Sequence, residues 1–348
     1  MALYPLVRPL AFALDAEKAH RMTIAALKLG IGTAFTPQPR DIPELRIKVA
    51  GIDFPNPIGL AAGFDKDAEV FEQMLTLKFG FVEVGTLTHK PQEGNPKPRL
   101  FRLVEDRAVI NRMGFNNQGQ DAALGRLKRR HKTRGIVGVN IGANKDSADR
   151  IADYADGIRR MAPVADYLTV NISSPNTPGL RQLQDEGALR ALLSAVEEAR
   201  SDDGPPVFLK VAPDLGAGEP DQIVRAALDH GIDAIIVANT TVSRPTLGSA
   251  HAGESGGLSG APLKALALEA LRTFRAASGG KVTLIAAGGV STADDAWERI
   301  TAGASLVQLY SAMVYEGPGI ARRIVQGLKE RVKREGLKSI EEAVGSAR

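Results

Sequence analysis

The sequence predicts an α/β fold, a (β/α)8 TIM barrel that follows an N-terminal two-helix extension. Three observations support this prediction. From residue 58 onward, short apolar runs alternate with helical patterns, the runs number eight, and no composition break divides this region into domains. Strands that alternate with helices are typical of a parallel sheet, and eight such units are typical of a barrel. An open doubly wound sheet is the alternative.

The N-terminal part of the chain predicts two short helices. The first has apolar residues at helical spacing, namely Leu6, Leu10 and Ala13. Asp15 can cap the second helix, whose stripe consists of His20, Ile24, Leu27 and Ile31. A stretch with three prolines, residues 32–43, ends it. We therefore expect residues 1–40 to form an extension and residues 41–348 the barrel domain. Such helices either pack on the body or present an apolar groove to a lipid surface.

The eight predicted strands are short and apolar, and each is followed by a polar or glycine-rich turn, as expected for buried strands. They lie at residues 58–61, 81–84, 136–139, 167–170, 207–211, 234–237, 282–286 and 305–309. Helical patterns between them include residues 188–200, 222–230 and 262–277.

Composition and charge exclude several classes of function. The chain has no cysteine, which excludes disulfides, thiolate metal sites and cysteine nucleophiles. A net charge of +4 and an aromatic content of 5% are too low to indicate nucleic-acid binding. Charged residues interrupt the apolar runs near the N-terminus before they reach membrane-spanning length, and the run after Arg8 is too short for a signal peptide. We expect no metal site, no nucleic-acid partner and no transmembrane helix.

Polar residues and glycines follow the predicted strands, at the end where barrels carry their active sites. They are Ala62-Gly63-Phe64-Asp65-Lys66, Gly85-Thr86, Asn140, Asn171, Lys210, Asn239-Thr240-Thr241, Gly288-Gly289 and Tyr310-Ser311. Lys210 stands out because it lies inside an apolar strand, where an unpaired ammonium group is costly. We expect it to face a bound anion or an electron-rich ring, or else to form a Schiff base.

Two features indicate the kind of ligand. The glycine pair after the seventh strand and Tyr310-Ser311 after the eighth occupy the position where barrels hold a phosphate on backbone N–H groups. Several side-chain amides, each with a donor and an acceptor, suit a flat ring with alternating C=O and N–H edges. They belong to Asn111, Asn171, Asn176 and Asn239. A phosphorylated ligand and a uracil-like or flavin-like ring are predicted.

The longer motifs resemble those of the dihydroorotate dehydrogenases, specifically their membrane-associated, quinone-using class 2. The most distinctive are Asn-Arg-Met-Gly-Phe-Asn-Asn at residues 111–117 and Asn-Ile-Ser-Ser-Pro-Asn-Thr at residues 171–177. Shorter matches occur in the family's order through nearly the whole chain, around Lys66, Lys210 and Tyr310.

This resemblance implies an enzyme that oxidises dihydroorotate to orotate with bound FMN in pyrimidine (UMP) biosynthesis. Ser174 matches the base that removes the proton from C5 while the C6 hydride moves to the flavin. The substrate-binding positions match Lys66, Asn111, Arg112, Met113, Gly114, Phe115, Asn171, Asn176, Asn239 and Thr240. The FMN-binding positions match Ala62, Gly63, Phe64, Asp65, Lys66, Thr86, Asn140, Asn171, Lys210, Ala238, Gly260, Gly289, Tyr310 and Ser311. Lys210 is then a charge partner for the flavin, and the Schiff base is disfavoured. Ala238 departs from the threonine common in the family.

For the N-terminal helices, the resemblance implies the mouth of a quinone tunnel at the membrane. His20, Arg102 and Tyr310 match positions near the quinone. The implied protein is a monomer bound peripherally at the cytoplasmic face of the cell membrane.

Three rival functions make different predictions. A lyase or aldolase with a Schiff base at Lys210 would carry no flavin and show no yellow colour. A non-catalytic membrane- or nucleic-acid-binding protein would not turn over dihydroorotate with any acceptor. Another flavin-dependent dihydropyrimidine oxidoreductase would act on dihydrouracil or dihydrouridine.

Overall fold

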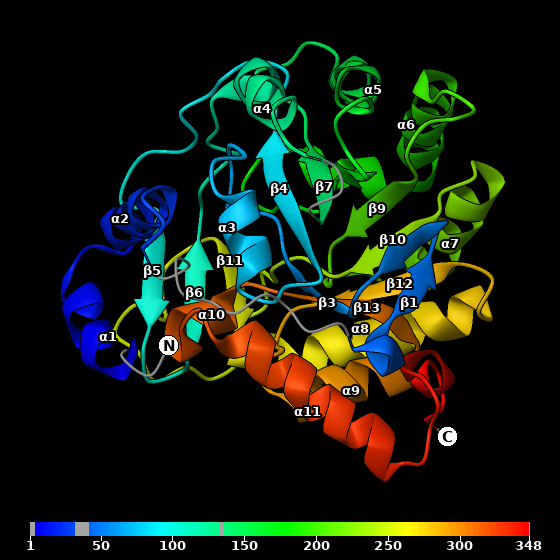
Figure 1. The fold of residues 1–348 in the computed structure, drawn as a ribbon. Coiled ribbons are helices and arrows are strands. Elements are labelled where there is room, and N and C mark those ends of the chain that lie inside the picture. Colours follow the sequence, from blue (N-terminus) through cyan, green and yellow to red (C-terminus); the bar gives the residue numbers. More distant parts are fainter. Residues whose placement is uncertain (1–3, 32–41, 132–134, 348) are drawn as a thin grey trace.

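The computed structural model describes residues 4–31, 42–131 and 135–347. Eight parallel strands close into a barrel in chain order, with the last beside the first (Figure 1). They are β3 (Ile58–Leu60), β4 (Phe81–Leu87), β7 (Ile136–Ile141), β8 (Tyr167–Asn171), β9 (Val207–Val211), β10 (Ala234–Val237), β12 (Thr283–Ala287) and β13 (Ala304–Leu309). All eight predicted strands are confirmed, with ends that differ by at most three residues. The barrel is therefore the correct fold, and the open sheet is not.

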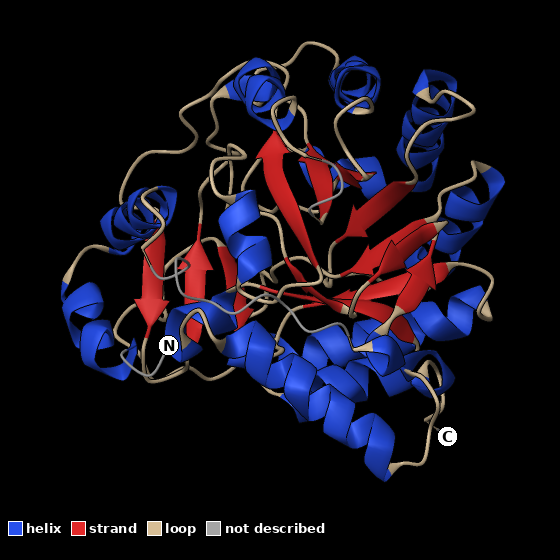
Figure 2. Ribbon diagram, viewed as in Figure 1, coloured by secondary structure: helices blue, strands red, loops and turns tan. Residues whose placement is uncertain are grey.

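Helices surround the barrel on its outside (Figure 2). They are α3 (Phe71–Thr76), α4 (Gly119–Leu127), α5 (Arg150–Met161), α6 (Glu186–Ala199), α7 (Glu219–Asp229), α8 (Lys264–Ser278), α9 (Ala293–Thr301), α10 (Ser311–Glu316) and α11 (Ile320–Arg334). The longer ones are amphipathic and bury one apolar stripe against the strands. In α6 this stripe is formed by Leu189, Leu192, Leu193 and Val196. A capping box of Thr292 and Asp295 begins α9.

Aromatic side chains fill the amino-terminal half of the barrel. The rings of Tyr167 and Phe208 stack with centroids 4.6 Å apart, and Phe81 meets Tyr167 edge-on. Two strand glycines make room for them, since a Cβ at Gly59 would lie 2.2 Å from the Phe81 ring and one at Gly138 would lie 2.0 Å from the Tyr167 ring. The barrel is consequently packed at this end, which leaves the carboxyl end for a ligand, as is usual in barrels.

Two small sheets were not predicted. The hairpin of β1 (Ile47–Val49) and β2 (Ile52–Phe54) precedes the barrel, and Phe54 contacts the ring of Phe81. A second sheet pairs β5 (Leu100–Leu103) with β6 (Ala108–Asn111) and β6 with β11 (Gly257–Gly260). This second sheet carries Asn111 and Gly260, so it belongs to the site.

The two predicted N-terminal helices form α1 (Tyr4–Ala13) and α2 (Ala16–Lys28). Asp15 caps α2 by accepting a hydrogen bond of 2.9 Å from the N–H of Lys18. The expected stripe is wrong at its end, because the helix stops at Lys28 and Ile31 is 61% exposed. The predicted proline-rich boundary lies largely within residues 32–41, outside the described residues. Within the described ranges, no helix has the length and apolar content needed to span a bilayer.

Helix α2 is fastened to the body by a buried ion pair. Glu17 accepts hydrogen bonds from Nε of Arg99 at 3.0 Å and from its terminal nitrogen at 2.7 Å. Both residues are buried, and Arg99 also donates to the carbonyls of Glu93 and Asn95. A two-pronged guanidinium–carboxylate contact fixes orientation as well as distance. The extension is thus packed on the barrel domain.

Candidate active site

A cavity of about 480 Å³ opens at the carboxyl end of the barrel and continues between α1 and α2. It brings together most of the predicted site residues, which come from nearly every strand end. Those lining it are Ala62, Gly63, Phe64, Lys66, Thr86, Asn111, Met113, Gly114, Phe115, Asn171, Ser174, Asn176, Lys210, Ala238, Asn239, Thr240, Gly260, Gly289, Tyr310 and Ser311, together with His20 and Arg102.

Three predicted residues do not line this cavity. The buried carboxylate of Asp65 instead accepts hydrogen bonds from the N–H groups of the chain that enters α3, and burial raises its pKa to about 6. Asn140 lies behind Thr86. Arg112 turns outward to Glu254, 2.7 Å away. These side chains support the wall or lie outside it.

The strand ends are joined by a buried amide network. Asn171 donates from Nδ2 to Thr86 Oγ1 at 3.0 Å and to Asn140 Oδ1 at 3.1 Å. The Thr86 hydroxyl donates to the same Asn140 oxygen at 2.6 Å. Because every bond restrains a side chain at the end of a different strand, the network holds Asn171 in one orientation toward the cavity.

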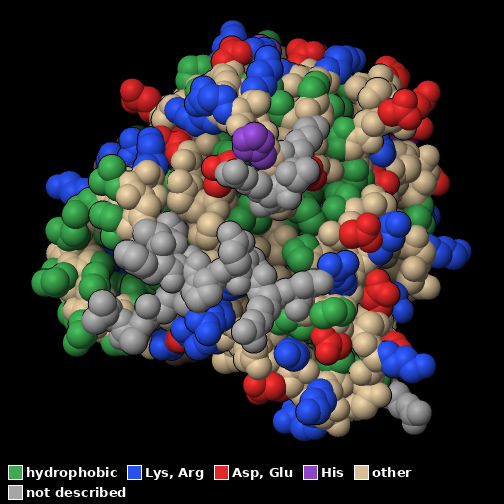
Figure 3. Space-filling view, in the orientation of Figure 1, with side chains coloured by type: hydrophobic (Ala, Val, Ile, Leu, Met, Phe, Trp, Pro, Cys, Tyr) green, Lys and Arg blue, Asp and Glu red, His purple; other side chains and the backbone are tan. Residues whose placement is uncertain are grey.

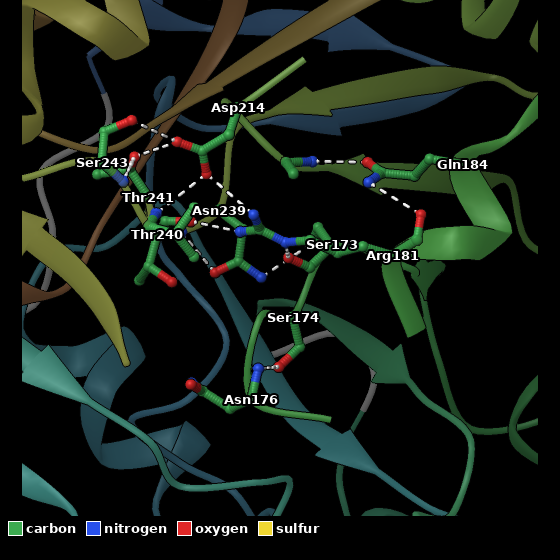
Figure 4. Close-up of polar contacts among 12 residues, drawn as sticks. Ser173, Ser174, Asn176, Arg181, Gln184, Asp214, Asn239, Thr240, Thr241 and Ser243 are labelled. Atoms are coloured by element: carbon green, nitrogen blue, oxygen red, sulfur yellow. Dashed lines mark hydrogen bonds and ion pairs between the residues drawn. The ribbon is translucent and has the colours of Figure 1, made fainter. Parts of the chain in front are cut away.

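The loop after β8 carries Ser174, which is 6% exposed. Its Oγ accepts a hydrogen bond of 3.2 Å from the N–H of Asn176 (Figure 4). Such a bond favours negative charge on the oxygen. Asn176 in turn donates from Nδ2 to Asn111 Oδ1 at 3.2 Å, so the loop reaches the β6 side of the cavity.

The floor of the cavity holds a buried charge pair. Nζ of Lys210 lies 3.9 Å from Oε1 of Glu83, and Glu83 is fully buried. The carboxylate also accepts hydrogen bonds from Asn140, Tyr167, Thr169 and Gln308. Burial lowers the pKa of Lys210, although the nearby carboxylate opposes that shift. The pair places a cation at the cavity floor.

Residues at this end fit a flat cofactor that bears an anionic group. The amide oxygen of Gln308 is buried, lines the cavity and has no hydrogen-bond partner within the described residues. The turn after β12 has a positive φ at Gly289, where a Cβ would lie 2.4 Å from the Cα of Lys264. This close approach requires glycine, and Gly288 and Gly289 both line the cavity. Lys210 and the glycine turn offer donors to such an anionic group, while the Gln308 oxygen can accept a hydrogen bond from a ring N–H.

Aromatic and basic side chains lead from the barrel mouth to the helices. The His20 ring contacts Phe64 edge-on with centroids 5.3 Å apart, and Phe64 contacts Tyr310 in the same way at 5.7 Å. Burial holds the pKa of His20 well below its ordinary value, so the imidazole is neutral at pH 7. Arg102 donates to the carbonyls of Ala11 and Leu14, which secures the carboxyl end of α1.

Comparison with known proteins identifies the family. A family model described as dihydroorotate dehydrogenase matches residues 44–332. The chain belongs to the dihydroorotate dehydrogenase family. A protein of Novosphingobium aromaticivorans named dihydroorotate dehydrogenase (quinone) is 65% identical, over 99% of this chain and 100% of its own. One of the same name from Erythrobacter litoralis is 64% identical over 99% of each chain.

A solved structure supports the fold. The crystal structure of DHODH from Eimeria tenella in complex with ferulenol superimposes with a TM-score of 0.90, at 41% identity and over 95% of each chain. The family comprises dehydrogenases, and the protein is an oxidoreductase with a TIM barrel.

Four residues with clear structural roles in this dehydrogenase site were not predicted: Glu83, Ser173, Arg181 and Asp214. Glu83 carried a signal, since a charged residue inside the apolar run of β4 raises the same question as Lys210 does in β9. Ser173 links Asn171 and Asn239, through hydrogen bonds of 2.6 and 2.8 Å. Arg181 carried no signal, because Asp214 and Thr240, two of its three partners, lie 33 and 59 residues away in the sequence.

Replacing Lys210 by methionine is expected to destabilise the protein by about 3–5 kcal/mol, because it leaves the buried Glu83 carboxylate without its cation. Urea unfolding of the cofactor-free protein measures the loss. The double variant Glu83→Gln/Lys210→Met removes both charges and should recover part of it. Equal stability of the wild type and Lys210→Met would contradict the charge pairing.

Proposed function

We propose that the protein oxidises (S)-dihydroorotate to orotate in de novo pyrimidine (UMP) biosynthesis, with bound FMN, and delivers the electrons to a membrane quinone. The observation that carries this proposal is the single cavity that joins a polar, amide-lined end at Ser174 to an apolar end between α1 and α2. One end suits a small polar ring and the other a hydrophobic one. The family membership and the quinone-linked names of the relatives support it.

At the polar end, asparagine side chains bind and orient the dihydropyrimidine ring. Asn111, Asn171, Asn176 and Asn239 line the cavity and offer both donors and acceptors to its imide edge. Lys66 pairs with the substrate carboxylate. Burial lowers the pKa of Lys66 to about 8, so it still carries its charge at pH 7. The remaining substrate contacts are the backbone and side chains of the turn from Met113 to Phe115 and Thr240.

Ser174 removes the proton from C5 of the substrate. An ordinary hydroxyl is a weak base, so its oxygen needs assistance. The N–H of Asn176 supplies part of it by donating to Oγ. Ser173 and Ser174 are both buried. Burial at these two residues excludes bulk water from the proton being moved.

When bound, FMN would accept two electrons and could pass them on singly or in pairs. The residues that would hold it line the cavity at the ends of β3, β12 and β13, with Lys210 at the ring and Gly289 at the phosphate. Ala238 occupies the position where the family often has threonine, so this chain lacks one hydroxyl at the ring. We propose a small change in affinity from that difference.

The other end of the cavity would receive the quinone and face the membrane. His20, Arg102 and Tyr310 line the cavity, and we assign all three to this end. Apolar side chains are exposed on α1, with Leu6 and Leu10 each 72% exposed. Figure 3 shows hydrophobic side chains gathered at the end of the molecule where α1 lies. The proposal is a monomer bound peripherally to the cytoplasmic face of the cell membrane.

Anaerobic mixing tests the proposal in two steps. Dihydroorotate is expected to bleach the flavin absorption, and dihydrouracil should not, because it lacks the carboxylate that Lys66 pairs with. A quinone added next should restore the absorption much faster than fumarate or NAD. Bleaching by dihydrouracil alone would point to another dihydropyrimidine oxidoreductase, and faster recovery with fumarate or NAD would remove the quinone from the proposal.

A further inference from the structure

Arg181 connects three loops of the active site without lining the cavity. It lies in the 3-10 helix η3 (Leu180–Gln184), seven residues after Ser174. Nε donates to the carbonyl of Ser173 at 3.0 Å, one terminal nitrogen to the Asp214 carboxylate at 2.9 Å, and the other to the carbonyl of Thr240 at 2.9 Å. Figure 4 shows the guanidinium between these partners. Each of its three nitrogens thus holds the loop after a different strand.

The partner carboxylate is itself fixed by the loop after β10. Asp214 accepts hydrogen bonds from the Thr241 hydroxyl, from the N–H of Val242 at 3.1 Å and from the Ser243 hydroxyl at 3.1 Å. Burial alone would raise the pKa of Asp214, but these bonds and Arg181 outweigh it and hold the pKa below its ordinary value. Asp214 is therefore ionised at neutral pH, and the ion pair persists there.

The guanidinium is planar and its N–H groups point in set directions, so three simultaneous bonds fix the relative positions of the three loops. Those loops carry the residues that the reaction needs: Ser174 follows Ser173 directly, and Asn239 precedes Thr240. Neither Arg181 nor Asp214 lines the cavity, so neither touches the substrate or the cofactor. The Arg181 guanidinium, with its three partners in a fixed geometry, therefore restrains the positions of the loops and takes no direct part in the reaction.

We propose that Arg181, held by Asp214, is a positioning residue that sets the distance between the Ser174 oxygen and the substrate bound by Asn239 and Thr240. This inference rests on the proposed function, because it takes Ser174 as the base. A displacement of about 1 Å at a reacting atom costs on the order of 100-fold in rate. The loss should fall mainly on the rate constant of flavin reduction and less on the dihydroorotate concentration that half-saturates it.

The chain offers a matched control at the opposite end of the barrel. Arg200 donates to Asp233 at 2.8 Å and to the carbonyl of Gly231 at 2.6 Å. Its side chain is 23% exposed, against 22% for Arg181. Arg200 precedes β9 at the amino end, and its side-chain partners among the described residues, Gly231 and Asp233, lie outside the active-site loops. Arg200→Ala therefore removes a similar ion pair with no effect expected on the reaction.

The test compares Arg181→Ala and Arg200→Ala with the wild type, each loaded with FMN, in anaerobic stopped-flow reduction by dihydroorotate. Arg181→Ala should reduce its flavin about 10–100-fold more slowly, and Arg200→Ala should match the wild type. Guanidinium ion, at a concentration that leaves the wild type unchanged, should restore part of the Arg181→Ala rate. Asp214→Asn should also reduce its flavin more slowly than the wild type, by a smaller factor. This variant replaces Arg181→Ala in the test if Arg181→Ala does not fold.

Amide hydrogen exchange gives a readout independent of turnover. In the cofactor-free protein, residues 171–179 should exchange faster in Arg181→Ala than in either the wild type or Arg200→Ala. Three results would overturn the positioning role. The first is a wild-type rate of flavin reduction in both Arg181→Ala and Asp214→Asn, and the second is an equal loss of rate in Arg181→Ala and Arg200→Ala. The third is a slow Arg181→Ala variant whose hydrogen exchange is unchanged. A wild type that dihydroorotate does not reduce would instead overturn the proposed function.

Discussion

Replacing Ser174 by alanine is expected to leave FMN and orotate binding intact and to slow flavin reduction by dihydroorotate about 10²–10⁴-fold. The methyl group that remains occupies no new space, so the amide network around Asn171 stays in place. What is lost is the oxygen that takes the C5 proton. Single-turnover reduction measured by flavin absorption gives the rate, and orotate titration of the oxidised enzyme gives the binding.

A cysteine in place of Ser174 tests whether the loss in Ser174→Ala comes from the missing base or from a change in the shape of the site. A thiol has an ordinary pKa of about 8.5 and acts as a base only when it is deprotonated. The Ser174→Cys rate should therefore rise with pH and level off above the pKa of the thiol, while Ser174→Ala should stay slow throughout. If Ser174→Ala reduced its flavin at nearly the wild-type rate at neutral pH, Ser174 would not be the base.

Replacing both Leu6 and Leu10 by aspartate is expected to detach the protein from lipid and to slow its reaction with a long-chain quinone. Each buried leucine side chain contributes about 1.5–3 kcal/mol and each 1.4 kcal/mol is tenfold, so vesicle binding should fall at least ~100-fold. Flavin reduction by dihydroorotate should be unchanged, because α1 lies at the far end of the cavity. Vesicle co-sedimentation and stopped-flow reoxidation measure the two effects.

Leu228→Asp on α7 is the matched control, since Leu228 is 40% exposed but far from α1 in the fold. A water-soluble short-chain quinone should reoxidise all variants alike. Deleting residues 1–39 also tests whether the N-terminal helices contact the membrane. The deletion perturbs the protein more strongly, because it also removes Glu17, the ion-pair partner of the buried Arg99. Unchanged vesicle binding and long-chain quinone reoxidation in Leu6→Asp/Leu10→Asp would rule out α1 as the membrane contact.

The strands and the general place of the site could be predicted from the sequence because both depend on local order. A strand buried on both faces is a continuous apolar run, and the residues just after each run share one end of the barrel. The motifs around Asn111 and Ser174 also indicated the family that the comparison identified. The two small sheets were missed, because most of their strands are not continuous apolar runs: charged residues such as Lys48, Asp53 and Arg102 interrupt them. The stripe through Ile31 failed where the helix ended earlier.

Only the tertiary structure decided which side chains meet. Asp65 and Arg112 lie at motif positions, yet their side chains turn away from the cavity, and Asn140 lies behind Thr86. Glu83 pairs with Lys210 although the two lie far apart in the sequence, and Arg181 pairs with Asp214 and Thr240, which lie 33 and 59 residues away. Closure of the barrel brings such residues together. Sequence periodicity tells which face a residue occupies, whereas the partner it finds there depends on how the whole chain packs.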